Sequence, residues 1–104
     1  MTKYHAVRTW SELNQRWFAS KGEAKRADEL ALLQRAGEIC GLEFQKRFIL
    51  CEKPRRRTIT IDFTYIENYH RVYEDYKGYM TRDFQTKLLW LKEKHGIDVR
   101  ITHR

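Results

Sequence analysis

Three consecutive stretches of this chain alternate between apolar and polar residues, which is the pattern of strands that bury one face. Residues 42–50, 57–66 and 71–77 carry this alternation, and residues 97–101 repeat it near the C-terminal end. Side chains two residues apart in a strand share a face, so each stretch predicts one apolar and one polar face. The chain is therefore expected to build a sheet from three consecutive strands and a later fourth strand.

Two stretches with helical periodicity flank the three consecutive strands. Residues 20–36 place apolar side chains three and four apart, after Ser20 as N-cap and before a glycine that can end the helix. Residues 81–95 show the same arrangement after Thr81. The order helix, three strands, helix and strand predicts an α/β fold of the α+β kind. The inner face of the second helix is expected to contain Phe84, Leu88, Leu91 and Trp90.

The length of 104 residues predicts a single domain over residues 1–104. Residues 1–19 fit no pattern as well and are expected to form an N-terminal extension, in which a short hairpin could turn near residues 14–15. No apolar stretch reaches about 18 residues, and the first residues lack the apolar core of a signal peptide. Cys40 and Cys51 form neither a disulfide framework nor a CxxC pair. Together these features predict a cytoplasmic protein with reduced thiols and no membrane partner.

The charge balance favours a polyanionic partner. Lys and Arg total 21 against 14 Asp and Glu, which gives a net charge of +7. A small basic domain is typical of nucleic-acid binding, although a basic surface that only keeps the protein soluble is the alternative. No GxxxxGK[ST], GxGxxG or GxSxG motif is present, so no nucleotide cofactor is expected. The turn between the first two strands carries three residues that could contact phosphates: Arg55, Arg56 and Arg57.

Asp62, Asp75 and Lys77 are the residues that most strongly suggest chemistry. Asp62 belongs to the polar face of the second strand, and Asp75 and Lys77 share a face of the third. If these strands pair, two carboxylates and an ammonium meet on the sheet. Mg²⁺ prefers oxygen ligands and keeps several waters, so two carboxylates with phosphate oxygens would suit it. An ammonium beside them could orient a water or stabilise charge on a phosphate. The structural alternatives are a solvated strand face and a simple ion pair.

Two glutamates each allow two interpretations. Glu23 stands three residues after Ser20, as a capping box requires, but it also lies on the inward-facing stripe of its helix with Leu30. Its carboxylate could therefore cap the helix or reach the two aspartates. Glu74 is expected on the opposite face of its strand from Asp75, as a surface charge or as the partner of a basic residue.

Two glutamines are weaker candidates for contacts with the nucleophile or with phosphate. Gln45 lies on the polar face of the first strand, and Gln85 lies in the first turn of the second helix, where backbone N–H groups favour phosphate. An ordinary polar surface position is the alternative for both residues.

Five segments of the chain resemble a family of small phage and prophage proteins assigned to the PD-(D/E)XK nuclease superfamily. The segments are SKGEAKR, LLQRAGEI, LEFQ, IDFTYIEN and EDYKG, and the likeness runs from about residue 16 to residue 102. The resemblance implies a restriction-endonuclease-like αβββαβ core, with a mixed sheet flanked by helices. One departure is visible, because Ile61 precedes Asp62 where the superfamily name places proline.

The resemblance also implies roles for single residues. It makes Asp62 and Asp75 metal-binding carboxylates, Lys77 the catalytic lysine, and Glu23 the helix carboxylate that completes the site. Gln45 falls where the family carries a strand glutamine of less certain role. The cofactor implied is Mg²⁺, for which Mn²⁺ could substitute.

The function expected from residues and resemblance together is a Mg²⁺-dependent DNA endonuclease in phage DNA recombination or processing. Branched DNA such as a Holliday junction is one candidate substrate, and the host cytoplasm is the location for a phage-encoded protein. A small nuclease that acts on two strands often works as a symmetric dimer, so a homodimer is a further expectation. The alternatives are a catalytically inactive DNA-binding module and a phage adaptor protein that docks on an acidic protein surface.

Overall fold

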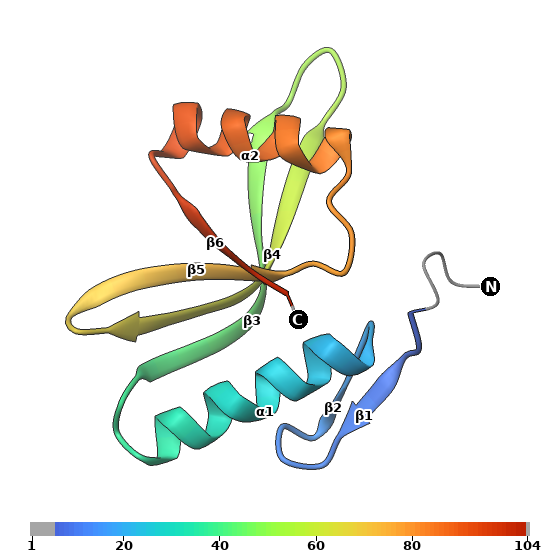
Figure 1. Cartoon of the computed structure of the whole chain (residues 1–104). Helices are drawn as coiled ribbons and strands as arrows, with labels where there is room; N and C mark the ends of the chain where they lie inside the picture. The colour runs from blue at the N-terminus through green and yellow to red at the C-terminus, as the bar shows by residue number, and fades with distance from the viewer. Residues whose placement is uncertain (1–5, 104) are drawn as a thin grey trace.

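The computed structural model describes residues 6–103, and its fold is a mixed α+β arrangement with two helices and two sheets (Figure 1). The larger sheet has the strand order β3-β4-β5-β6, in which only the β5–β6 pair is parallel, and β1 and β2 form a separate antiparallel pair. The predicted α+β class and the predicted order of elements are confirmed. In chain order the elements are β1 (Thr9–Ser11), β2 (Arg16–Phe18), α1 (Lys21–Arg35), β3 (Cys40–Cys51), β4 (Arg57–Glu67), β5 (His70–Tyr76), α2 (Arg82–His95) and β6 (Val99–Thr102).

Both helices begin and end where capping residues are found. Ser20 Oγ accepts a hydrogen bond from the Glu23 backbone N–H at 3.1 Å, and Thr81 Oγ1 accepts one from Phe84 N–H at 3.1 Å. These contacts satisfy backbone donors that the first turn of a helix leaves without partners. Gly96 caps the end of helix α2: its N–H donates to the Lys92 carbonyl at 2.9 Å, and its left-handed backbone (φ 69°) turns the chain out of the helix.

The N-terminal and C-terminal strands differ in how well the pattern predicted them. The expected hairpin near residues 14–15 is present as β1 and β2. The last strand begins at Val99 rather than at residue 97, because its pairing with β5 starts at Val99 and Tyr73. Asp98 is instead held by an ion pair to Lys92 at 2.6 Å. Residues 1–5, where the sequence predicts no signal core, lie outside the described residues.

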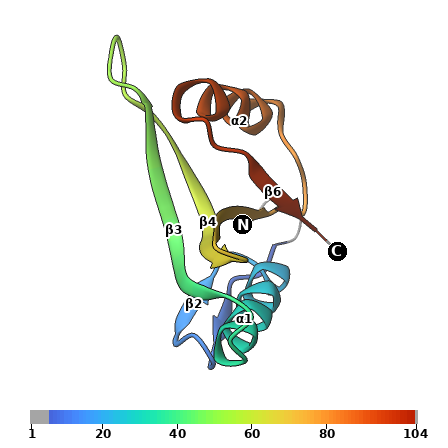
Figure 2. The same ribbon diagram turned by 90° about the vertical axis from the view of Figure 1, so that its left-hand side faces the viewer.

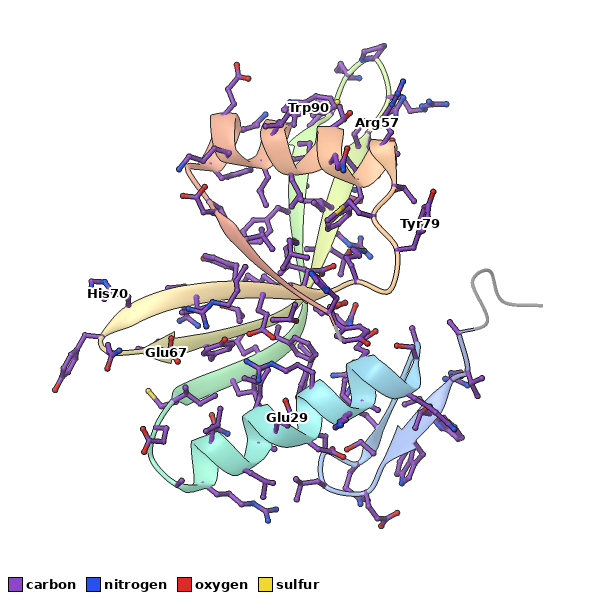
Figure 3. All side chains as sticks on the ribbon, viewed as in Figure 1. Glu29, Arg57, Glu67, His70, Tyr79 and Trp90 are labelled. Atoms are coloured by element: carbon purple, nitrogen blue, oxygen red, sulfur yellow. The ribbon has the colours of Figure 1, made fainter. Side chains whose placement is uncertain are left out.

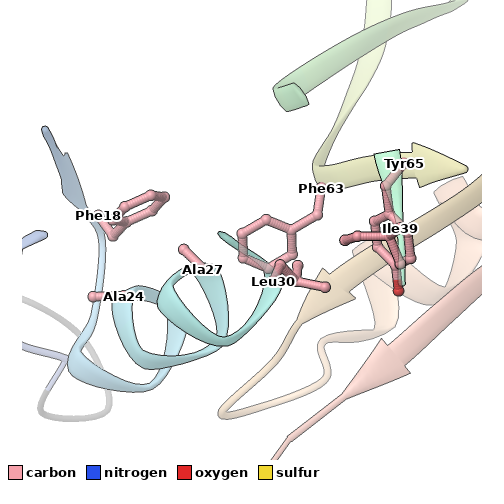
Figure 4. Close-up of a cluster of buried hydrophobic side chains, with 7 residues drawn as sticks. All are labelled: Phe18, Ala24, Ala27, Leu30, Ile39, Phe63 and Tyr65. Carbon is pink, nitrogen blue, oxygen red and sulfur yellow. The ribbon is translucent and has the colours of Figure 1, made fainter. Parts of the chain in front are cut away.

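The apolar core has two parts, one under each helix. Ala24, Ala27 and Leu30 of α1 pack with Phe63 and Tyr65 of β4 (Figure 4). Leu91 of α2 packs with Ile59 and Ile61, also of β4. These four β4 residues alternate along one strand face, so both helices cover successive lengths of the same face. Figure 2 shows this arrangement, with α1 beside one half of the β3–β4 hairpin and α2 beside the other.

Strands β4 and β5 separate at the point where the two parts of the core meet. Their ladder runs from Glu67 and His70 to Phe63 and Glu74, and the next pair would be Asp62 with Asp75. Along β5, Val72 and Tyr76 pack with the core part under α1, and Tyr73 packs with the part under α2. The separation exposes backbone N–H groups of both strands to side chains, and this determines the geometry described next.

Among the described residues, neither helix has the length and apolar character needed to cross a membrane.

Candidate active site

The side chains of Asp62 and Asp75 bridge the point where β4 and β5 separate. The Asp62 backbone N–H donates to Asp75 Oδ1 at 2.8 Å, and the Tyr76 backbone N–H donates to Asp62 Oδ2 at 2.9 Å. Each carboxylate thus binds a backbone donor of the opposite strand that would otherwise lack a partner, because the ladder has ended. The prediction that the two aspartates meet on one part of the sheet is confirmed.

Lys77 joins this pair from the end of β5. Its Nζ lies 3.1 Å from Asp75 Oδ2, and it also lies 3.8 Å from the centre of the Phe84 ring in α2. The contact with Asp75 is a close ion pair, and Asp75 Oδ2 is the one buried side-chain oxygen in the described part of the chain without a well-aligned hydrogen bond. An ammonium held by an aromatic face and a carboxylate has a restricted position.

Gln45 connects Glu23 to the aspartates. Gln45 Nε2 lies 3.3 Å from Glu23 Oε2 and 3.5 Å from Asp62 Oδ1, the second distance being at the limit for a hydrogen bond. The Gln45 backbone is left-handed (φ 58°), which is uncommon for a residue other than glycine, and Gln45 is skipped in the pairing of β3 with β4 at the position opposite Asp62. The turn of the backbone aims the amide across the sheet toward α1.

Glu23 combines the two interpretations that its sequence position allowed. Its backbone N–H makes the cap contact with Ser20, while its carboxylate is buried, with the whole residue 6% exposed, and faces Gln45. The capping interaction therefore leaves the carboxylate available to the cluster of Glu23, Gln45, Asp62, Asp75 and Lys77, which we call the acidic site.

Burial makes the acidic site unfavourable for negative charge. Burial, followed by the charges of Asp75 and Glu23, raises the pKa of Asp62 to about 8. Burial also raises the pKa of Asp75 above its usual value, against the opposing effect of the Lys77 ammonium. Burial and the charge of Asp75 raise the pKa of Glu23. Carboxyl groups with raised pKa values, gathered around one lysine, are common at functional sites.

The carboxylate oxygens of the acidic site are of the ligand type that a hard divalent cation prefers. The carboxylate oxygens of Asp62 and Asp75 are ligands that Mg²⁺ prefers, and the buried Asp75 Oδ2 still has acceptor capacity. Within residues 6–103, no set of three His, Cys, Asp or Glu side chains is arranged to hold a metal ion.

Glu74 lies on the other face of β5 and has a structural role. It is fully buried, and its carboxylate accepts hydrogen bonds from Arg26 Nε at 2.6 Å, Tyr65 Oη at 2.5 Å and Thr102 Oγ1 at 3.1 Å. Although burial alone would raise the pKa of Glu74, the hydrogen bonds from Arg26 and Tyr65 hold it below its usual value. Of the two interpretations from sequence, pairing with a basic residue is correct.

The remaining predicted contacts lie away from the acidic site. Gln85 is exposed and faces a groove between α2 and the segment before β6, together with Leu89 and Ile97. Arg57 begins β4, five residues before Asp62, which corresponds to roughly 17 Å along a strand. Arg55 and Arg56 lie beyond it in the turn. Residue spacing along the extended strand thus separates the three arginines from the carboxylates, and their expected contacts with phosphates stay a prediction.

Gly22 and Tyr76 were not singled out by sequence reasoning. A Cβ at Gly22 would lie 1.9 Å from Tyr76 Oη, so only glycine allows the start of α1 to approach β5 this closely. Tyr76 also supplies the backbone N–H that binds Asp62. The glycine inside the capping segment was the available signal, since glycine is unfavourable within a helix without such a reason.

Neither a curated protein nor a solved structure matches the chain. One family model does match, over residues 1–103, and it is described as a protein of unknown function. Because this match covers nearly the whole sequence, the chain belongs to the DUF1064 family.

Proposed function

We propose that this protein is a Mg²⁺-dependent DNA endonuclease that hydrolyses phosphodiester bonds at the acidic site. The observation that carries the proposal is the convergence of Asp62, Asp75 and Lys77, with Glu23 joined through Gln45, at the separation of β4 and β5. The net charge of +7 supports a polyanionic substrate. The resemblance to nuclease-like phage proteins supports a role in phage DNA recombination or processing.

Each residue of the acidic site has a role in this proposal. Asp62 and Asp75 would hold the metal ion, together with waters and phosphate oxygens, and Glu23 would complete the negative site. Bound Mg²⁺ would polarise the phosphodiester and lower the pKa of a water. Lys77, positioned by Asp75 and Phe84, would orient the attacking water or stabilise charge that develops on the phosphate. Gln45 would hold Glu23 and Asp62 in their relative positions.

The direct test is cleavage by the purified protein in Mg²⁺ or Mn²⁺. Linear, flapped and four-way DNA should be supplied in parallel, because branched DNA is one candidate substrate. We expect cleavage by the wild type and a loss of at least about 100-fold in Asp62→Asn, Asp75→Asn and Lys77→Ala. The matched control is Glu93→Gln, which neutralises an exposed carboxylate of α2. No cleavage of any substrate, or equal cleavage by wild type and Asp62→Asn, contradicts the proposal.

Metal binding can be measured separately from cleavage. Mg²⁺ at ten times its dissociation constant should stabilise the wild type by about 1.4 kcal/mol in the absence of DNA, and should leave Asp75→Asn unchanged. Thermal unfolding in a Mg²⁺ series, with Glu93→Gln as the control, provides this measurement. Equal stabilisation of all three proteins would place the bound ion outside the acidic site.

A DNA-binding module without catalysis is the second candidate function. It is favoured by one observation, namely that Asp62 and Asp75 already bind the backbone N–H groups of Tyr76 and Asp62. These two hydrogen bonds give both carboxylates a structural role that does not require catalysis. Metal dependence separates the two candidates, since the binding module should bind DNA equally well in Mg²⁺ and in a chelator.

A further inference from the structure

A basic groove lies at the other end of β4 from the acidic site. It has a volume of about 480 Å³ and lies between the tip of the β3–β4 hairpin and α2. Figure 3 labels Arg57 and Trp90 at this end of the molecule. The residues that the argument uses are Arg55 and Arg57 from the hairpin, and Asp83, Lys87 and Trp90 from α2.

The two arginines of this groove are available for a ligand. Arg55 and Arg57 are exposed, and neither guanidinium forms a salt bridge within the described residues. Their neighbour Arg56 is different, since its Nε lies 3.6 Å from Glu52 Oε1. Lys87 is paired with Asp83 at 3.7 Å, so the groove contains three cationic groups and one carboxylate. A guanidinium is suited to phosphate because its planar set of donors matches phosphate oxygens.

Trp90 adds an aromatic wall to the same groove. Its ring is partly buried against the α2 part of the core, and the remainder lines the groove. A fixed aromatic surface beside cationic side chains suits a nucleic-acid backbone, since sugars can pack on the ring while the cations contact phosphates, and the bases of an unpaired strand can also stack on it.

We propose that this groove binds the DNA backbone at a fixed distance from the acidic site, an inference that rests on the proposed function. Arg57 and Asp62 are separated by roughly 17 Å along β4. Phosphates of one DNA strand recur about every 3.4 Å along the helix axis, so the separation corresponds to about five nucleotides. Arg55 and Arg57 hold the phosphates, Lys87 adds charge, and Trp90 packs against the strand.

Binding should be measured without cleavage, so that the groove is tested independently of the reaction. A fluorescein-labelled duplex of about 20 base pairs is titrated in EDTA at several salt concentrations, with anisotropy as the readout. Each phosphate contact contributes about 0.9 to the slope of log K against log salt, so Arg55→Gln/Arg57→Gln should reduce that slope by about 1.8. The matched control is Arg35→Gln/Lys94→Gln, which removes the same charge from exposed positions at the far ends of both helices and should leave the slope within about 0.5 of the wild type.

Two further variants test the groove from other directions. Asp83→Asn removes the one carboxylate of the groove and should strengthen DNA binding. In Trp10→Phe/Trp17→Phe, Trp90 is the sole tryptophan, and its fluorescence should change on addition of the duplex. Equal affinity and salt slope for the arginine variant and its control, or unchanged Trp90 fluorescence, would overturn the groove proposal.

The cleavage reaction supplies the test of distance. Substrates with fewer than about five nucleotides on one side of the cut should be cleaved less than longer ones by the wild type, and this dependence should disappear in Arg55→Gln/Arg57→Gln. If DNA binds through the groove but no metal supports cleavage, the groove proposal is supported and the nuclease proposal is contradicted. If the arginine variant cleaves substrates of every length as the wild type does, the nuclease proposal is supported and the groove proposal is contradicted.

Discussion

At the scale of single residues, two opposing effects act on the aspartates of the acidic site: hydrogen bonds to backbone N–H groups and the cost of burying a charge. Asp62 and Asp75 bind backbone N–H groups where the ladder ends, and burial at the same time disfavours their charge. A group whose pKa is raised by folding stabilises the folded state while it is protonated. That contribution is complete below the unfolded pKa and is lost as the pH rises through the folded value.

The pKa of Asp62 therefore predicts a pH-dependent stability of the metal-free protein. Its value of about 8 in the folded state lies above the roughly 3.9 of an unfolded aspartate, so stability should decrease between about pH 4 and pH 8. Asp62→Asn removes the charge and retains an oxygen for the Tyr76 N–H. We expect it to be more stable than the wild type at pH 8 by roughly 1–3 kcal/mol, and the difference to shrink toward pH 4.

Urea unfolding in EDTA across this pH range measures the difference, with Asp98→Asn as an exposed aspartate control. If Asp62→Asn is less stable than the wild type at every pH, the hydrogen bond to Tyr76 outweighs the cost of the buried charge.

At the scale of elements, the approach of α1 to β5 determines where Glu23 can lie. Gly22 allows the first turn of the helix to contact Tyr76, and Glu23 follows directly. Alanine ordinarily stabilises a helix by about 1 kcal/mol relative to glycine. Substitution at Gly22 therefore shows whether this gain in helix propensity or the clash with Tyr76 has the larger effect on stability.

Gly22→Ala should destabilise the protein by about 1–3 kcal/mol, because the added Cβ overlaps the Tyr76 ring and forces it to move. Chemical denaturation of Gly22→Ala, Tyr76→Leu and the double variant measures the coupling. The alanine should cost less in the Tyr76→Leu background. Gly78→Ala is the control, since no atom lies within 4 Å of a Cβ at that position. A stabilised Gly22→Ala would show that the helix start can shift.

At the scale of the whole molecule, the buried network around Glu74 joins elements that are distant in sequence. Arg26 of α1, Tyr65 of β4 and Thr102 of β6 all bind this one carboxylate of β5, and Arg100 donates to Tyr65 Oη at 3.1 Å. Burial and the hydrogen bond to Glu74 raise the pKa of Tyr65 to about 12. The network holds α1 on the sheet and thereby positions Glu23.

Removing the Glu74 carboxylate from this network should destabilise the folded protein. Glu74→Gln removes the buried charged partner of Arg26, which keeps only its more exposed pair with Glu29, and should lower the free energy of unfolding by about 2–4 kcal/mol. The exposed pair of Glu52 and Arg56 provides the control, and Glu52→Gln should cost less than about 0.5 kcal/mol. Because folding lowers the pKa of Glu74, its contribution is present above about pH 4 and is lost as the pH falls below that value. Equal effects of the two substitutions in urea unfolding would contradict this role.

Short-range patterns in the sequence determined the elements and the faces of the strands. Helix caps at Ser20 and Thr81, the turn at Gly96 and the alternation along β4 depend on residues within a few positions of one another. The same alternation placed Asp62, Asp75 and Lys77 on compatible faces, so their convergence could be predicted once the strands were assumed to pair. The capping alternative for Glu23 could not be resolved at that level, because both interpretations use the same local spacing.

Only the tertiary structure decided the contacts between distant segments. It separated β4 from β5 at Asp62, turned the Gln45 backbone toward α1 and buried Glu74 beneath Arg26. Each of these contacts depends on how the helices and strands pack on one another, which cannot be predicted from residue periodicity or propensity. The sequence by itself therefore determined which residues could form a site, and packing decided which of them meet.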